Sequence, residues 1–160
     1  SWDNWMADEN RSGLTPFDLH IHDLDFMVYA FGAPKNAVRS RSRQADQDHL
    51  MAMYDFDGFT IHSEAAWYAP QSFKFNAGFR FQFEKAVVVS GADGLVVYEK
   101  DGGVIRAGAQ DGESAGLDLP VTDAYGNEIR YFADCVKQGM PADKIKPGEL
   151  ETVLTLLNAF

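Results

Sequence analysis

Apolar residues recur along the first part of this chain with the spacing of a helix. Between residues 17 and 28 they fall three or four positions apart, at Phe17, Ile21, Leu24 and Val28. Side chains with this spacing share one face of a helix, so the pattern predicts an amphipathic helix from about residue 15 to residue 30. We expect Thr15 to cap its start, Pro16 to occupy the first helical position and Gly32 to end it.

The middle of the chain alternates with the period of two that is typical of β-strands. In residues 73–83 apolar side chains occupy the odd positions, five of them phenylalanines. Strict alternation predicts a strand with one dry face, and Gly78 predicts a bend or bulge within it. Shorter strands are predicted at 38–43, 50–56, 59–68, 87–89, 95–98 and 104–106, with glycine turns such as Asp57-Gly58 between them.

The last part of the chain returns to helical spacing. We expect one helix from Thr122 to Gly139, and a final one from residue 150 to residue 160. A helix, a run of strands and two further helices predict an α+β fold. Its sheet is expected to be open and largely antiparallel, with helices packed on one face and covering the phenylalanines of 73–83. The length of 160 residues suits a single domain, 1–160.

Composition narrows the classes of function. The net charge of −10 disfavours nucleic acid, whose phosphates need Lys and Arg, and it disfavours anionic membrane surfaces. No apolar run reaches the length of a membrane span. The only cysteine, Cys135, cannot form an internal disulfide and fits a reducing, cytoplasmic setting. Its place among helical apolar positions predicts a buried thiol.

The first predicted helix also carries candidate chemistry. Asp18, His22 and Asp25 are spaced i, i+4 and i+7, which places them on one stripe. A carboxylate can orient an imidazole, so Asp18 and His22 form a plausible proton-transfer pair. The residue pattern also allows a plainer interpretation, in which Asp18 only stabilises the helix dipole and His22 is an ordinary histidine.

A metal site is a second interpretation of the same segment. His20 and His22 lie close to Asp23 and Asp25 in the sequence. Residues two apart on a helix point about 200° apart, so the two histidines cannot chelate one ion there. We therefore expect no metal site, and we consider metal-dependent hydrolysis by these histidines the weakest hypothesis.

The same segment resembles a known family. Ser12-Gly13, the run Asp18-x-x-x-His22-Asp23-x-Asp25 and the later Phe31-Gly32-x-Pro34 are similar to the second domain of the Gfo/Idh/MocA oxidoreductases, which are sugar, inositol and related polyol dehydrogenases. Residues 125–139 resemble the penultimate helix of that family, and residues 147–151 resemble the start of its last helix. The chain departs from the family pattern at Ser12 and at His20.

The resemblance implies a C-terminal domain of the glyceraldehyde-3-phosphate dehydrogenase-like type, which binds substrate and forms a homo-oligomer through its sheet face. NAD or NADP would be bound mainly by an N-terminal Rossmann domain that is absent from this chain, and we expect this fragment alone to be inactive. His22 would exchange a proton with a sugar, sugar acid or polyol hydroxyl, assisted by a lysine of the absent domain. Asp18 would orient His22 or bind substrate, and Trp5 would lie near the substrate.

A non-enzymatic alternative remains open from the residues alone. The chain would then be a stand-alone α+β module that binds a ligand or dimerises without catalysis. A reading frame that starts at or near Ser1 would favour this module, whereas an upstream Gly-x-Gly-x-x-Gly unit would favour the dehydrogenase.

Overall fold

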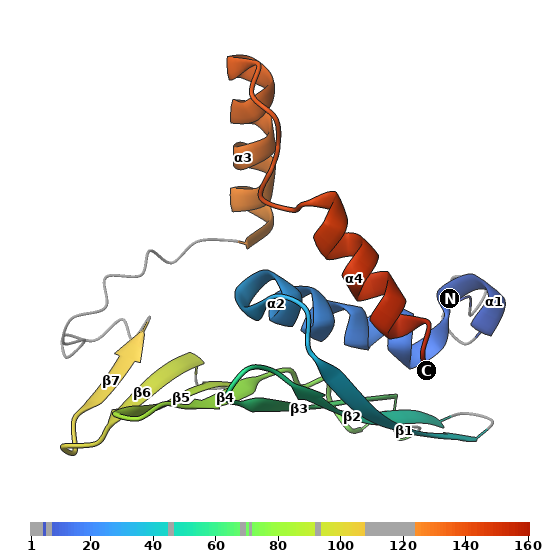
Figure 1. The fold of residues 1–160 in the computed structure, drawn as a ribbon, viewed down its shortest axis with the longest axis horizontal. Helices are drawn as coiled ribbons and strands as arrows, with labels where there is room; N and C mark the ends of the chain where they lie inside the picture. The colour runs from blue at the N-terminus through green and yellow to red at the C-terminus, as the bar shows by residue number, and fades with distance from the viewer. Residues whose placement is uncertain are drawn as a thin grey trace. The chain divides into compact units, whose positions relative to one another are not determined.

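The computed structural model describes residues 5, 8–44, 47–67, 70, 72–91, 94–107 and 124–160. The chain divides into two compact units (Figure 1). The first consists of Ser1–Phe73 and Ala142–Phe160, and the second of Lys74–Pro141. Each unit is described by itself.

The first unit is a three-stranded antiparallel sheet with two helices on one face (Figure 1). Its elements include a short helix, a π-helical turn, three strands and two longer helices. In chain order they are α1 (Glu9–Ser12), η2 (Pro16–His20), α2 (Ile21–Phe31), β1 (Asn36–Gln44), β2 (Gln47–Asp55), β3 (Thr60–Trp67) and α4 (Pro147–Leu157). The strand order is β1-β2-β3, with Leu50 of β2 paired to Arg41 on one side and Ala65 on the other. Helix α4 returns from the end of the chain to pack against α2.

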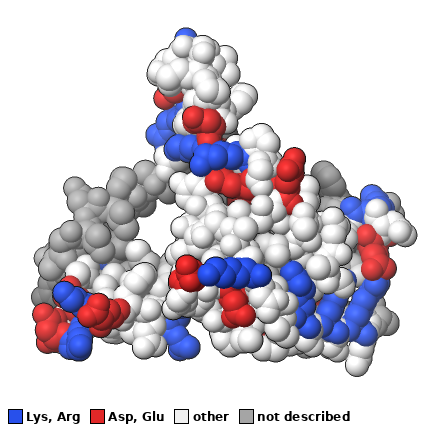
Figure 2. All heavy atoms as spheres, viewed as in Figure 1, with Lys and Arg blue, Asp and Glu red and all other residues white. Residues whose placement is uncertain are grey.

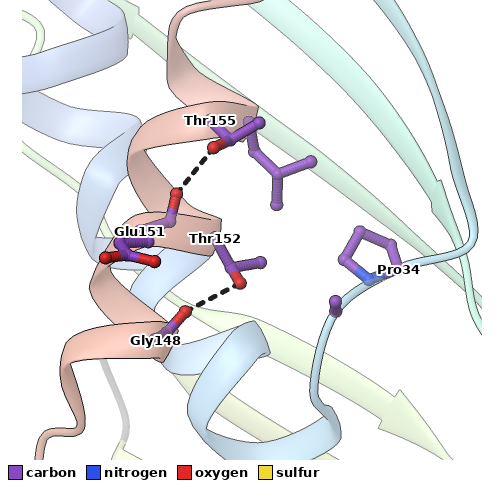
Figure 3. Close-up of a pocket in the computed structure, with 7 residues that line it drawn as sticks. Pro34, Gly148, Glu151, Thr152 and Thr155 are labelled. Carbon is purple, nitrogen blue, oxygen red and sulfur yellow. Dashed lines mark hydrogen bonds between the residues drawn. The ribbon is translucent and has the colours of Figure 1, made fainter.

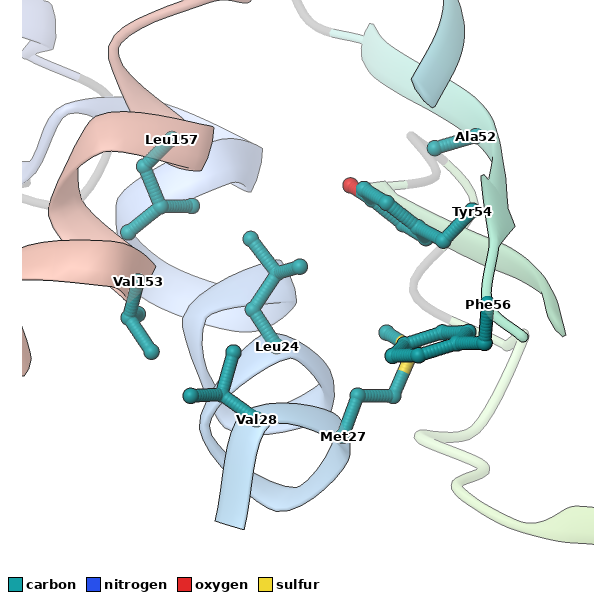
Figure 4. Close-up of a cluster of buried hydrophobic side chains, with 8 residues drawn as sticks. All are labelled: Leu24, Met27, Val28, Ala52, Tyr54, Phe56, Val153 and Leu157. Carbon is teal, nitrogen blue, oxygen red and sulfur yellow. The ribbon is translucent and has the colours of Figure 1, made fainter. Parts of the chain in front are cut away.

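The core of this unit lies between β2 and the two helices (Figure 4). Every second residue of β2 is buried, which is the pattern of a strand with one covered face. These side chains meet apolar residues of α2 and α4 in a cluster made of Leu24, Met27, Val28, Ala52, Tyr54, Phe56, Val153 and Leu157. The predicted helical stripe is confirmed at Leu24 and Val28, whereas Phe17 remains partly exposed.

The chain reaches the first long helix through a sharp reversal. Asp8 caps α1, and Gly13 and Leu14 both have left-handed backbone angles, with φ of 72° and 58°. The predicted capping role of Thr15 is wrong, because Thr15 already has helical angles and makes no capping hydrogen bond. Its hydroxyl donates instead to the carbonyl of Asp48 on β2. Thr15 therefore fixes the turn to the sheet rather than capping the start of a helix.

The predicted turn at Asp57-Gly58 joins β2 to β3. Gly58 has a left-handed φ of 88°, which glycine adopts without steric cost. The turn is closed by a hydrogen bond of 2.9 Å from the Phe56 N–H to the Phe59 carbonyl. The rings of Phe56, in the core, and Phe59, which is exposed, stack at 4.9 Å across the turn.

In its described residues the second unit contains a four-stranded antiparallel sheet and the helix α3. Its elements are β4 (Phe79–Gln82), β5 (Ala86–Gly91), β6 (Gly94–Glu99), β7 (Val104–Ala107) and α3 (Ala124–Gln138). The strands follow one another in the order β4-β5-β6-β7. The predicted glycine turns lie at the hairpins between β5 and β6 and between β6 and β7, and Cys135 on α3 is buried as expected.

The predicted long strand at 73–83 is wrong in its extent and its burial. Only Phe79–Gln82 pairs with β5, and the side chains of Phe73, Phe75, Phe79 and Phe83 are each 40% or more exposed. Pairing begins directly after Gly78, where the carbonyl of Ser90 approaches too closely for any Cβ atom. Alternation predicts an extended chain with one apolar and one polar face, but the apolar face is buried only where another layer of the structure packs on it. Because these four rings stay at least 40% exposed, the face that they share is not buried.

The α+β fold class is confirmed. Every strand pair in the described parts of the chain is antiparallel, and α2 and α4 cover one face of the sheet β1–β3. In the portion that the structure describes, no helix is long and apolar enough to cross a membrane.

Candidate functional site

Two histidines that are two residues apart have opposite environments. His20 is fully buried, whereas His22 is exposed at the start of α2. Between Pro16 and His20 the helix is of the π type, and the N–H of Ile21 bonds to the carbonyl of Pro16, five residues back. Such turns are rare in proteins, and those that occur often lie at functional sites.

The predicted pair Asp18 and His22 lies where the π turn meets α2. Asp18 lies within the turn and is half-buried, and His22 follows it on α2. Within the described chain neither side chain makes a hydrogen bond or ion pair with another residue. Both groups are therefore available to an external partner.

The buried side chain of His20 connects three elements. Its Nδ1 lies 3.1 Å from Oδ2 of Asp23 on α2 and 3.3 Å from the hydroxyl of Ser63 on β3. Its Nε2 lies 2.7 Å from the hydroxyl of Tyr54 on β2. Ser63 also donates to Asp23 at 3.1 Å. We call these four residues the His20 network.

The network is satisfied by one tautomer of the imidazole. With the proton on Nδ1, His20 donates to Asp23, and its Nε2 accepts from the Tyr54 hydroxyl. The ring of Phe160 packs edge-on against the imidazole at 5.4 Å. Burial raises the pKa of Tyr54 to about 12, so its hydroxyl remains a donor at neutral pH.

A second buried group holds the other end of the π turn. Asp48 on β2 accepts two hydrogen bonds from Arg41, at 2.8 and 2.7 Å, and one from the N–H of Thr15 at 3.0 Å. Burial by itself would raise the pKa of Asp48, but the hydrogen bonds from Arg41 and Thr15 outweigh it, and the pKa lies below its ordinary value. The hydrogen bond to Asp48 likewise raises the pKa of Arg41. We call Thr15, Arg41 and Asp48 the Asp48 clamp.

The edge strand β1 carries three arginines on the face that the helices cover. Figure 2 shows basic side chains gathered over this strand, beside acidic ones. Arg41 belongs to the Asp48 clamp, and Arg43 pairs with Glu9 at 2.7 Å. Arg39 lies over the rings of Tyr54 and Phe160, with its guanidinium carbon 6.0 and 5.5 Å from their centroids. The basic edge is thus largely used to hold α1, the turn and the end of the chain.

The other candidate residues are less informative. Trp5 is half-buried ahead of α1, and its carbonyl accepts from the N–H of Asp8. Trp2, a second aromatic before the helix, lies outside the described residues. In the described parts of the chain no three His, Cys, Asp or Glu side chains are grouped to hold a metal ion, and His20 and His22 do not share one environment.

A pocket of about 380 Å³ lies between the loop after α2 and the helix α4 (Figure 3). Ala33 and Pro34 form one side, and Thr152 and Thr155 lie on the other. Both threonine hydroxyls donate to carbonyls of their own helix, at 2.9 and 2.7 Å. The pocket is at the opposite end of α2 from His22, roughly 15 Å away along the helix axis. It is therefore separate from the candidate site.

The first unit, a sheet covered on one face by two helices, is an α+β arrangement (Figure 1). The family model described as the GFO/IDH/MocA C-terminal domain matches residues 1–97, more than half of the chain. This protein belongs to that oxidoreductase family, whose C-terminal domain is of the glyceraldehyde-3-phosphate dehydrogenase-like type. A search of curated proteins finds no match. The matched residues contain the π turn, His20 and His22, and the whole sheet β1–β3.

Sequence analysis missed the His20 network and the Asp48 clamp. The only signal for His20 was that it departs from the family pattern, which does not show which way its ring points. The alternation of β2 did place Tyr54 on one face with Leu50. Asp48 precedes the residues that we assigned to that strand, so the pattern gave no reason to expect a buried carboxylate there.

Proposed function

We propose that this chain is the substrate-binding half of a nicotinamide-dependent dehydrogenase that acts on a hydroxyl of a sugar, sugar acid or polyol. The observation that carries the proposal is the exposure of His22 beside Asp18, at the start of α2, in a member of an oxidoreductase family. Histidine is suited to proton transfer near neutral pH, and here it has no competing partner in the described chain.

In this proposal His22 takes the proton of the substrate hydroxyl while hydride leaves the carbon that bears it. Asp18 accepts a hydrogen bond from a second substrate hydroxyl or from His22, and Trp5 forms part of the substrate wall. The remaining contribution of the domain is to orient the hydroxyl and exclude water. These roles rest on the family resemblance at Asp18-x-x-x-His22 and on the exposure of His22.

The nicotinamide would be held by another domain of the longer protein. The sequence contains no Gly-x-Gly-x-x-Gly segment, and its glycine turns at 91–94 and 101–103 join antiparallel strands. The residues of this chain therefore do not fit a dinucleotide fold. When bound, the nicotinamide would accept the hydride. The single cysteine supports a reducing, cytoplasmic setting for such an enzyme.

The open face of the sheet β1–β3 is the proposed subunit contact. Val38 of β1 faces Met53 of β2, and both are exposed together with Met51 on the side away from the helices. Light scattering of the full-length protein should show a homo-oligomer. The double variant Met51→Glu, Met53→Glu should shift it toward monomer, and a monomeric wild-type protein would refute this contact.

The test of function is a screen of the full-length protein. Aldoses, sugar acids and inositols are offered with NAD and, separately, with NADP, and the absorbance of the reduced nicotinamide is followed. We expect turnover with at least one polyol or sugar hydroxyl. His22→Ala should abolish most of it, whereas Tyr29→Phe, which changes an exposed residue further along α2, should not. Equal turnover in the two variants would contradict the assignment of His22.

A further inference from the structure

We propose that His20 is a positioning residue, whose buried network fixes the π turn that presents Asp18 and His22. The proposal rests on the proposed function, because it assigns to His20 the placement of the group that moves the proton. It concerns the geometry of the site and not the identity of the substrate.

The first step is the way in which the two ends of the turn are held. Thr15, just before the turn, is bonded to Asp48, and His20, its last residue, is bonded to Tyr54. Both partners lie on the buried face of β2. The π turn is therefore held at both ends by one strand, and Asp18 between these two contacts and His22 just after them reach the surface.

The second step is how the His20 network holds the rotation of α2 about its axis. Asp23 follows His22 directly, and its carboxylate is held by both His20 and Ser63. His22 thus lies in sequence between two residues of the same network. A rotation of α2 about its axis would break the bonds of His20 and Asp23 together. The network therefore fixes the rotation of the helix at the position where His22 leaves it.

The third step excludes chemistry at His20 itself. A serine, a histidine and an aspartate meet here, as they do in nucleophilic triads. In this structure, however, the imidazole has no exposed surface, its Nε2 is occupied by Tyr54, and Ser63 contacts the carboxylate and Nδ1. No nitrogen remains to activate the Ser63 hydroxyl toward an external substrate.

The fourth step is the energetic logic of a buried polar network. An apolar residue would fill the space beneath the turn without the need to satisfy two ring nitrogens. Fully satisfied buried networks rigidify a structure and specify one arrangement of it. A π turn exchanges the regular hydrogen bonds of a helix for a less common pattern, so it needs such external ties to persist.

The test uses Tyr54→Phe in the full-length protein, because this change removes one hydroxyl and keeps the ring in the core. Tyr29→Phe is the matched control, since Tyr29 is an exposed tyrosine on α2, outside the network. The nitrogen resonances of the imidazoles are recorded by NMR for both variants, together with kcat and KM. Ser63→Ala is a second variant, on the other side of His20.

We expect Tyr54→Phe to shift the resonances of both His20 and His22 and to lower kcat by about 10- to 100-fold, with KM changed less than about threefold. Ser63→Ala should act in the same direction, and Tyr29→Phe should leave all signals and rates unchanged. A variant in which His20 shifts while His22 and kcat do not would overturn the proposal.

The imidazole spectrum also separates this proposal from the proposed function. Coupled shifts of His20 and His22 in a protein that transfers no hydride to NAD or NADP would support the positioning of the turn and refute the dehydrogenase. Turnover that depends on His22 but not on Tyr54 or Ser63 would support the dehydrogenase and refute the positioning role.

Discussion

The two sides of the segment from Thr15 to Val28 differ in what the protein does with polar groups. On the buried side Thr15 and His20 have hydrogen bonds at short distances to Asp48 and Tyr54 of β2. On the exposed side Asp18 and His22 have none within the described chain. The comparison teaches that the same short helix carries groups that are satisfied by the fold and groups that are left for a partner. Substitutions on the two sides should consequently have different effects.

The largest expected loss of stability follows from breaking the Asp48 clamp. Arg41→Met should lower the free energy of unfolding by about 3–5 kcal/mol, because it leaves a buried carboxylate without its cation. Chemical denaturation monitored by circular dichroism measures this loss. Lys35→Met is the control, since Lys35 pairs with Asp57 on the surface, and it should cost under about 1 kcal/mol. Equal losses would show that the clamp is not a buried ion pair.

A purely apolar change on the buried side should have the next largest effect. Leu24 is 1% exposed in the core, so Leu24→Ala should cost about 2–4 kcal/mol through lost burial and a residual cavity. Denaturation gives the value, and kcat per folded molecule should remain near that of the wild type. A large fall in kcat at full folding would mean that the core of α2 shapes the site beyond the turn.

The reversal before the turn should be the next most sensitive position. Gly13→Ala introduces a Cβ into a backbone with φ of 72° and brings it 2.7 Å from Phe17. We expect a loss of about 1–2 kcal/mol from the strained backbone and the displaced ring. Gly58→Ala is a useful control, because Gly58 in the turn between β2 and β3 also has a positive φ but its Cβ would meet nothing within 4 Å. A loss at Gly58 equal to that at Gly13 would assign the whole effect to the backbone.

The last expected effect is on the stability of the protein at acid pH, and it is absent at neutral pH. The pKa of Asp48 is lower in the folded state, so its contribution to stability is complete above the unfolded pKa of about 4 and disappears as the pH falls through the folded value. The melting temperature of the wild type should therefore fall below about pH 4. A series of melts from neutral to acid pH, compared with Asp48→Asn, checks this. An identical acid dependence in the variant would assign it to other carboxylates.

The regular elements could be predicted because each has a local signal. The helical spacing that includes Leu24 and Val28, the alternation in β2 and the Asp57-Gly58 turn all depend on neighbouring residues, and the structure confirms them. The long strand at 73–83 was predicted from an equally clear pattern and is mostly wrong. Its alternation says nothing about whether a second layer is present, and Gly78 delays the pairing.

The geometry of the site could be predicted only in part. The family motif selects Asp18 and His22, but Asp18 lies in a π turn that no local sequence pattern predicts. The two ends of this π turn are held by contacts of Thr15 with Asp48 and of His20 with Tyr54, and these partners lie more than thirty positions away in the sequence. Long-range contacts of this kind are not visible in helical spacing, and neither is the buried direction of the His20 ring.

The most direct test of the account joins activity and stability in one variant. His22→Ala in the full-length protein should lower kcat by about 10²- to 10⁴-fold, the usual range for loss of a general acid–base group. Its melting temperature should stay within about 2 °C of the wild type, because an exposed side chain without partners contributes little to folding. An unchanged kcat with the substrate that the wild type turns over would contradict the account. It would remove His22 from the chemistry and leave its exposure without a function.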